Sequence, residues 1–262
     1  MKIEFYKYEG TGNDFIIIDN RDKKLKANNP DLWKKLCDRH FGIGADGLML
    51  IQNKKGYDFE MVYFNADGNQ SSMCGNGGRC ITHLAKKLGI VKGKSATFMA
   101  IDGEHEVVFS KKDTVKLKMM DVKSINHNIS YYTLNTGSPH YVIFVKNVLK
   151  LPVKIEGSSI RNSKSFKKEG INVNFVEVQK NKVPILRTYE RGVEDETLSC
   201  GTGTTAAALV LATKGLSTAK DHCDIQTMGG MLTVWFTPDK KGFKDIWLEG
   251  PATLVFKGEV EA

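Results

Sequence analysis

The chain has 262 residues, of which 41% are apolar and 26% charged, which excludes a disordered polymer and suits one large domain or two small ones. The net charge of +8 comes from lysines scattered along the chain, which favours a solvated basic surface over a nucleic-acid-binding stripe. The same charge can attract a small anionic substrate.

Predicted strands and helices follow the same order in the two halves of the chain. In each half, extended runs rich in β-branched and aromatic residues come before a helix, and further extended runs follow it. The first helix carries Ile81, Leu84 and Ala85 at helical spacing and has Gly89 at its C′ position. The second is apolar nearly all round over residues 206–212, so it should be buried in its own domain. The predicted strands cover residues 15–19, 59–64, 96–101, 104–109, 141–145, 174–178, 185–189, 224–228 and 232–236.

A sequence repeat links the two halves. Cys74-Gly75-Asn76-Gly77-Gly78 reappears 126 residues later as Cys200-Gly201-Thr202-Gly203-Thr204, and five further matches occur at spacings of 125 to 128 residues. We therefore expect two similar α/β domains from a gene duplication, with the active site most simply placed between them. The first domain should span residues 1–118, with residues 252–262 returning to it as a strand, and the second should span residues 119–251.

Each repeated string places a cysteine before glycines that let a ligand approach the backbone closely. At a helix start the first amides lack internal partners and carry about half a positive charge, so they bind carboxylates and lower the pKa of a neighbouring thiol. A single cysteine at a helix start is more often a buried packing residue than a catalytic group. Cys74 and Cys200 at equivalent positions instead predict thiols on opposite faces of one molecule. That arrangement suits inversion of a stereocentre, in which one thiol takes the α-proton and the other returns a proton.

The remaining cysteines and the apolar runs indicate the compartment. The longest apolar run, residues 206–212, is far shorter than the roughly 20 residues of a membrane helix, and the first ten residues resemble no secretion signal. Five scattered cysteines in such a chain predict thiols rather than a disulfide framework. We expect a cytoplasmic protein that binds a small molecule and neither nucleic acid nor membrane. Cys37, Cys80 and Cys223 are expected to be packing residues, because they lack the paired spacing of a zinc site.

Five strings together resemble the diaminopimelate epimerase family, in that family's order and over nearly the whole chain. They are Gly10-Thr11-Gly12-Asn13-Asp14-Phe15, Phe64-Asn65-Ala66-Asp67-Gly68, Met73-Cys74-Gly75-Asn76-Gly77-Gly78-Arg79-Cys80, Tyr189-Glu190-Arg191-Gly192 and Cys200-Gly201-Thr202-Gly203. The resemblance implies cofactor-independent interconversion of LL- and meso-2,6-diaminoheptanedioate, in the synthesis of lysine and cell-wall precursors. It also implies a homodimer and an α/β (α+β) fold of two pseudo-symmetric domains, each a curled mixed sheet around a central helix, with the ligand in the cleft between them.

The resemblance also implies roles for single residues, and it implies no metal and no other cofactor. The acid/base pair is Cys74 and Cys200, with His140 and Glu190 as polar groups beside the reacting centre. The residues implied to bind the substrate are Asn13, Asn65, Gly75, Asn76, Asn172, Glu190, Arg191, Gly201 and Thr202. An arginine can take a carboxylate bidentately and a glutamate can pair with an ammonium, so these roles are chemically sensible. Two positions depart from the family pattern. Gly47 stands where some members have glutamine, and Ser138 stands where many have asparagine. No ligand contact is therefore carried over to either residue.

Three alternatives remain open at this point. The first is a related cofactor-independent racemase, such as one for proline, although Asn76 and the Glu190-Arg191 pair favour the longer diacid. The second is a thiol hydrolase or transferase with Cys74 as nucleophile and His140 as base. The third is a non-catalytic binding protein. A dinucleotide site at residues 201–206 is disfavoured, because the G-x-G-x-x-A pattern there follows a polar stretch rather than a hydrophobic strand.

Overall fold

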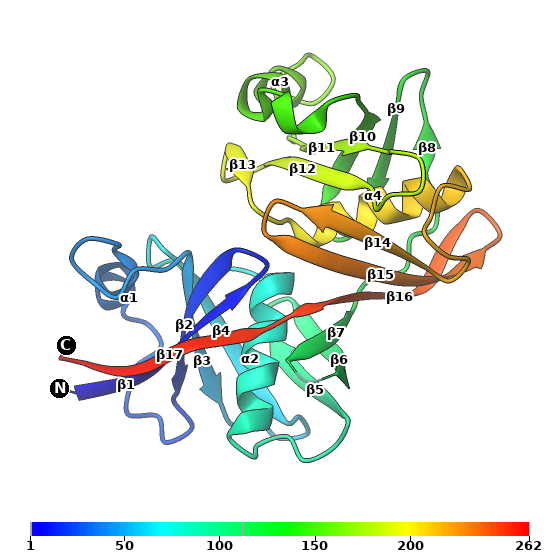
Figure 1. Ribbon diagram of the computed structural model, residues 1–262. Helices are drawn as coiled ribbons and strands as arrows, with labels where there is room; N and C mark the ends of the chain where they lie inside the picture. Colours follow the sequence, from blue (N-terminus) through cyan, green and yellow to red (C-terminus); the bar gives the residue numbers. More distant parts are fainter. Residues whose placement is uncertain (1, 112, 262) are drawn as a thin grey trace. The chain divides into compact units, whose positions relative to one another are not determined.

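The computed structural model describes residues 2–111 and 113–261 and divides the chain into two units (Figure 1). Unit 1 comprises Met1–Leu117 and Gly250–Ala262, and unit 2 comprises Lys118–Glu249. None of the helices formed by the described residues is long and apolar enough to cross a membrane.

Unit 1 is a mixed sheet with a helix on each face. Its strands follow the order β17-β1-β2-β3-β4-β5-β6-β7, in which β2–β3 and β4–β5 are parallel pairs and the others are antiparallel. The elements are β1 (Lys2–Gly10), β2 (Asn13–Asp19), α1 (Pro30–Cys37), β3 (Gly47–Gln52), β4 (Phe59–Asn65), α2 (Gly75–Lys87), β5 (Ser95–Ala100), β6 (Gly103–Lys111), β7 (Thr114–Lys118) and β17 (Thr253–Glu261).

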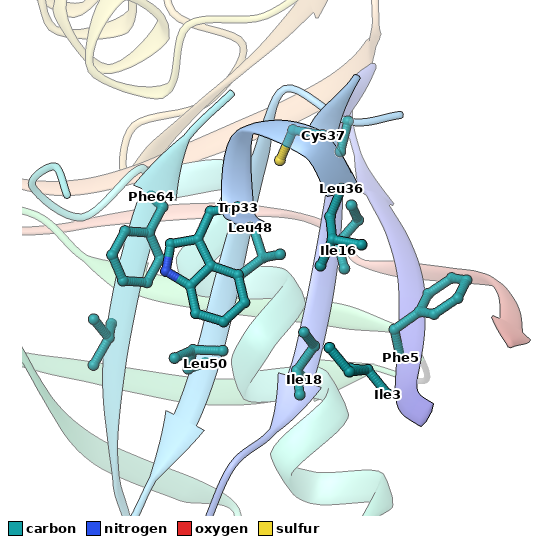
Figure 2. Close-up of a cluster of buried hydrophobic side chains, with 12 residues drawn as sticks. Ile3, Phe5, Ile16, Ile18, Trp33, Leu36, Cys37, Leu48, Leu50 and Phe64 are labelled. Carbon is teal, nitrogen blue, oxygen red and sulfur yellow. The ribbon is translucent and has the colours of Figure 1, made fainter. Parts of the chain in front are cut away.

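Successive side chains along the central strands of unit 1 point to opposite faces of the sheet, so both helices have apolar side chains to pack against. Ile16 of β2 belongs to the core cluster shown in Figure 2, in which the Trp33 ring of α1 lies 5.5 Å from the ring of Phe64. Phe15 points to the opposite face, where its ring lies 3.5 Å from the position that a Cβ would take on Gly77 of α2. The start of α2 is therefore seated directly on the sheet.

Unit 2 repeats this plan. Its strands follow the order β8-β9-β10-β11-β12-β14-β15-β16, with β10–β11 and β12–β14 parallel and the other pairs antiparallel, while β13 adds to β12. Helix α3 packs on the core of Val173 and Tyr189. The elements are β8 (Asn126–His127), β9 (Tyr131–Asn135), β10 (Pro139–Phe144), η1 (Val148–Lys150), α3 (Val153–Arg161), β11 (Asn172–Glu177), β12 (Ile185–Glu190), β13 (Asp195–Thr197), α4 (Gly201–Thr213), β14 (His222–Thr227), β15 (Gly230–Asp239) and β16 (Gly242–Pro251).

The predicted duplication is confirmed by strand order and by the two central helices. From β1 to β7 and from β9 to β16, leaving β13 aside, the strand pairs have the same sequence of parallel and antiparallel neighbours. Helices α2 and α4 each have 13 residues. Each is followed by a glycine in the left-handed region, Gly89 with φ 72° and Gly215 with φ 68°. As predicted, α4 is buried, from Gly203 to Leu211.

Candidate active site

The two repeated cysteines occupy the N-cap positions of the central helices. Cys74 precedes α2 with φ −92° and ψ 129°, and Cys200 precedes α4 with φ −114° and ψ 112°. Neither thiol makes a side-chain capping bond to its helix. Each sulfur therefore lies beside the positive end of a helix, where a thiolate is stabilised. Cys74 is partly exposed and Cys200 is buried.

The glycine two residues after each helix start allows the first turn to pack closely. A Cβ on Gly203 would lie 2.4 Å from Oδ1 of Asn174 and 3.3 Å from the sulfur of Cys200. A Cβ on Gly77 would lie 3.1 Å from the sulfur of Met49. A side chain at Gly203 would collide with Asn174 and push the start of α4 away from its sheet, whereas at Gly77 the Met49 side chain would have to shift by only a few tenths of an ångström.

In unit 1, four of the residues implied to bind substrate gather around the start of α2. The side chain of Asn76 is buried and donates to Oδ1 of Asn13 at 2.8 Å. Asn13 in turn donates to Oδ2 of Asp46 at 2.7 Å. Asn65 is exposed at the end of β4, opposite Gly47, which pairs with Phe15 of β2. Asn13, Asn65, Gly75 and Asn76 thus share one edge of the unit with Cys74.

Behind Asn13 lies a charge network that the sequence analysis did not identify. Arg39 donates to both carboxylate oxygens of Asp14, at 3.0 and 2.7 Å, and to Asp46 at 2.8 Å. Burial alone would raise the pKa of Asp14, but the hydrogen bonds from Arg39 and Lys7 outweigh it and lower the pKa to about 2. The network holds Asp46, and therefore the amide of Asn13, in one orientation. Asp14 stands in one of the quoted strings, but Lys7, Arg39 and Asp46 lie outside them, so no local signal marked the network.

The space beside Gly47 is filled by the ring of Tyr63. Tyr63 stands opposite Met49 in the β3–β4 register, yet its ring leans toward Gly47, where a Cβ would meet its Cε2 at 2.5 Å and its hydroxyl oxygen at 2.7 Å. The lean carries the tyrosine hydroxyl toward the edge that holds Asn65. A side chain at position 47 and this position of the Tyr63 ring exclude each other.

In unit 2, Asn172 and Arg191 form one cluster that Ser138 holds together. Oδ1 of Asn172 accepts the backbone N–H of Arg191 at 2.8 Å, and its amide donates to Oγ of Ser138 at 2.8 Å. The Arg191 guanidinium donates to the same Oγ at 3.3 Å and to the carbonyl of Glu169 at 2.9 Å. Glu190 accepts from the hydroxyl of Thr197 at 2.9 Å. Ser138 therefore links Asn172 and Arg191, two of the residues implied to bind substrate.

His140 is buried and neutral. Desolvation, with the charge of Arg191 second, lowers its pKa to about 3. Its Nδ1 accepts from the amide of Asn174 at 3.1 Å, because the carbonyl of Asn174 is engaged by the hydroxyl of Thr188 at 3.0 Å. The proton therefore sits on Nε2, which is buried and has no hydrogen-bond partner among the described atoms. Since Asn174 touches Gly203, the imidazole is linked to the turn that carries Cys200.

The other three cysteines are inert packing residues, as predicted. Burial raises the pKa of Cys37 to about 12 and that of Cys223 to about 11, and it raises the pKa of Cys80 further. Across residues 2–111 and 113–261, no cysteine is in a disulfide and no group of three or more histidine, cysteine or acidic side chains is placed to hold a metal.

Comparison with known proteins gives full-length matches to one family. The family model for diaminopimelate epimerase matches residues 5–125 and 132–255. The chain is 50% identical to the diaminopimelate epimerase of Flavobacterium psychrophilum, over 97% of this chain and 99% of the relative. It is 39% identical to that of Chlorobaculum tepidum, over 96% of this chain and 98% of the relative.

Solved structures match in fold at low sequence identity. A phenazine biosynthesis protein of the PhzF family from Bacillus anthracis superposes with a TM-score of 0.78 at 15% identity, over 100% of both chains. A probable proline racemase from Agrobacterium radiobacter superposes with a TM-score of 0.68 at 15% identity, over 99% of this chain and 93% of that one. Both are alike in fold, and at such identity they indicate nothing about the substrate.

Proposed function

The chain belongs to the diaminopimelate epimerase family, and on that premise we propose that Cys74 and Cys200 are the acid/base pair of its reaction. The enzyme is an isomerase that interconverts LL- and meso-2,6-diaminoheptanedioate, a step of lysine biosynthesis. The observation that carries the assignment of the pair is that both cysteines cap the central helices of two equivalent units. Neither helix has another titratable group at its cap.

In this mechanism one cysteine is a thiolate and the other a thiol when substrate binds. The thiolate takes the α-hydrogen as a proton, and the electron pair of the C–H bond moves into the α-carboxylate. The thiol gives its proton to the opposite face of the carbon, which inverts the centre and leaves the charges of the two sulfurs exchanged. The amides of Gly75-Asn76 and Gly201-Thr202 stabilise the charge on the carboxylate oxygens, a contribution of about 10²–10³ in rate for each donor in comparable sites.

The polar residues around the start of α2 in unit 1 and around Ser138 in unit 2 are proposed to bind the rest of the substrate. The Arg191 guanidinium bonds two neutral acceptors and, among the described residues, forms no ion pair, so its charge is suited to a substrate carboxylate. Glu190 is suited to an ammonium group. Asn13, Asn65 and Asn172 offer both donors and acceptors, which separate an amine from an acid. Recognition of both ends of the diacid would exclude shorter amino acids, since unpaired polar groups would remain in the site.

His140 and Glu190 are proposed to support the reacting centre. A neutral imidazole with its proton on Nε2 is a hydrogen-bond donor that cannot readily become a cation in this buried position. It can therefore stabilise negative charge on a nearby sulfur or oxygen without quenching it by proton transfer.

The decisive experiment is epimerisation of the LL isomer in deuterated water. We expect the meso product to carry one deuterium at the inverted carbon in the first turnovers, while recovered substrate stays unlabelled, because the acid that delivers the proton is not the base that removed one. Product that keeps the original hydrogen, or label that appears equally in recovered substrate, would contradict two separate groups.

Substrate and variant panels separate the rival functions. Turnover of proline without turnover of LL-diaminopimelate would indicate the related racemase. A thiol hydrolase or transferase based on Cys74 needs no second thiol, so Cys200→Ala would keep substantial activity. A binding protein would keep its function in both Cys74→Ser and Cys200→Ser.

We also propose that the enzyme is a cytoplasmic homodimer. Its cysteines are thiols rather than disulfides, which suits a reducing compartment. The strand β17 exposes the apolar side chains of Val255 and Phe256, which supports an apolar contact with a second copy of unit 1. Sedimentation of the wild type and of Val255→Lys tests this, with a monomer expected for the variant and a monomeric wild type contradicting the proposal.

A further inference from the structure

The hairpin turns that follow the two central helices are equivalent. Ala100 pairs with Gly103 across the turn between β5 and β6, and Thr227 pairs with Gly230 across the turn between β14 and β15. The second pair lies 127 residues after the first. Each two-residue turn is followed by a glycine with positive φ, 122° for Gly103 and 138° for Gly230. The duplication therefore reproduces the turn as well as the helix.

In unit 1 this turn holds the residue that precedes Cys74. Met73 donates its backbone N–H to Oδ1 of Asp102, the second residue of the turn, at 3.3 Å. The carbonyl of Cys74 accepts the backbone N–H of Gly78 at 2.7 Å. The sulfur of Met73 lies 3.0 Å from the position that a Cβ would take on Gly78, so Met73 also packs on the helix. The backbone is thus anchored on both sides of Cys74, to the turn and to α2.

The carboxylate of Asp102 is itself held in place. Nε2 of His105 lies 3.2 Å from the same Oδ1 atom, and the side chain of His105 is 14% exposed. The His105 ring stacks on that of Phe98 with centroids 5.2 Å apart, and Phe98 stacks on Phe59 at 5.0 Å. Both phenylalanines are fully buried. Asp102 is therefore a surface side chain whose orientation is set from the core of unit 1.

In unit 2 the turn holds the equivalent peptide group by its other end. Gly229, which stands 127 residues after Asp102, donates its backbone N–H to the carbonyl of Leu198 at 2.8 Å. The peptide group that contains this carbonyl lies 126 residues after the one that contains the N–H of Met73, as Cys200 lies after Cys74. Two chemically different hydrogen bonds therefore hold one equivalent peptide group to one equivalent turn. What the two units share is the position of this peptide, just before the cysteine.

We infer that Asp102 is a positioning residue for Cys74, and that the backbone N–H of Gly229 has the same role for Cys200. This inference rests on the proposed function, in which the two thiols transfer protons. The anchored peptide keeps each sulfur at the positive end of its helix. Proton transfer requires the heavy atoms to lie within about 2.6–3.2 Å of each other, so a small displacement of the sulfur slows it strongly. Asp102 acts through the peptide of Met73 and not by contact with substrate.

The first test compares Asp102→Ala with Asp102→Asn in the full-length protein. Alanine removes the acceptor of the Met73 N–H, whereas asparagine keeps an oxygen in its place. We expect Asp102→Ala to lower kcat about tenfold or more with little change in KM, and Asp102→Asn to recover most of that loss. A rise in KM without a fall in kcat would overturn the inference, because it would indicate a contact with substrate instead.

Alkylation without substrate separates an effect on Cys74 from a general loss of stability. Iodoacetamide reacts with thiolates, and mass spectrometry of the peptides reports Cys74 and Cys200 in one sample, so Cys200 is the internal reference. In Asp102→Ala the pH midpoint of Cys74 should rise by about half a pH unit, which slows its reaction about threefold below the midpoint, because a displaced sulfur loses part of its stabilisation by the helix end. Equal changes at both cysteines, or no change at Cys74, would overturn the inference.

The matched control is Asp58→Ala, which removes another exposed carboxylate of unit 1 that accepts a backbone N–H, that of Thr97 in β5 at 2.8 Å. It should leave kcat and both midpoints in place, and a loss as large as that of Asp102→Ala would overturn the inference. Hydrogen exchange of the wild type needs no variant. The amide of Met73 should exchange more slowly than in an unfolded chain, and an unprotected amide would also overturn the inference. Because alkylation and hydrogen exchange need no turnover, these outcomes are distinct from the deuterium result that tests the proposed function.

Discussion

The amide of Asn76 donates to the side-chain carbonyl of Asn13 at 2.8 Å and so joins the first turn of α2 to the start of β2. Asn76→Asp replaces this buried donor with an acceptor that faces another acceptor. We expect kcat/KM to fall at least about tenfold, and the free energy of unfolding to fall by about 1–3 kcal/mol, as for other buried groups left without a partner. Steady-state kinetics and urea unfolding measure both. Asn53→Asp, an exposed change of the same kind, should alter neither, and wild-type kinetics in Asn76→Asp would remove Asn76 from the site.

The two capping cysteines should be equally indispensable. Cys74→Ser and Cys200→Ser replace a thiol by a hydroxyl, a much weaker acid, and each should lower kcat by about 10²–10⁴, the usual contribution of a general acid or base. Cys223→Ser is the control, because Cys223 is a buried packing residue of unit 2. It should retain most of the activity. A large loss in one capping variant only would point to a single-thiol mechanism.

Gly47 and Tyr63 should behave as a coupled pair. Gly47→Ala brings a Cβ within 2.5 Å of the Tyr63 ring, and overpacking of this kind costs about 1–3 kcal/mol of stability. Tyr63→Ala should recover part of that loss in the double variant, since the ring is then absent while the carbonyl of Phe64, at 2.8 Å, remains. Urea unfolding of the four proteins gives the coupling energy. Gly93→Ala, where a Cβ makes only ordinary contacts, is the control. Strict additivity of the two changes would contradict the pairing.

The buried His140 should make stability depend on pH. The folded protein binds a proton at this imidazole only near pH 3, whereas the unfolded chain does so near 6.5. Below pH 6.5 the unfolded state therefore holds more protons, and stability falls as the pH drops toward 3, by up to about 1.4 kcal/mol per pH unit. His140→Asn should flatten this slope in urea unfolding between pH 6.5 and 4. The exposed His40→Asn serves as the matched control, and an unchanged slope in His140→Asn would show that the ring is not neutral as described.

The elements that could be predicted from the sequence are those with a local signal. Both central helices are predicted because a Cys-Gly string precedes each, with residues at helical spacing after it in the first half and the apolar run 206–212 after it in the second. Helix α1 was not predicted, although Asn29 accepts the N–H of Leu32 at 3.4 Å and Pro30 begins the helix. It is only eight residues long, too short for periodicity to stand out. The strand β3 is buried along almost its whole length, and such an apolar run does not separate a strand from a helix.

The candidate site was predicted only in part for a similar reason. The resemblance implied residues for the site, but not the residues that hydrogen-bond to them. Arg79 stands inside one of the quoted strings, yet its guanidinium donates to Thr11 and to the carbonyl of Pro251, which is 172 residues away. The link from Arg39 to Asn13 passes through Asp46 and likewise arises only when β2 and β3 pair. Contacts of this kind exist only after folding, so spacing along the chain carries no trace of them.

The pairing of β17 with β1 has a consequence for biosynthesis. Unit 2 is one continuous segment, whereas unit 1 is completed by a strand that is translated after it. On the ribosome, unit 2 can therefore reach its native structure first, while β1 waits with an unsatisfied edge. A nascent chain stalled before residue 253 would expose that edge to chaperones and to aggregation.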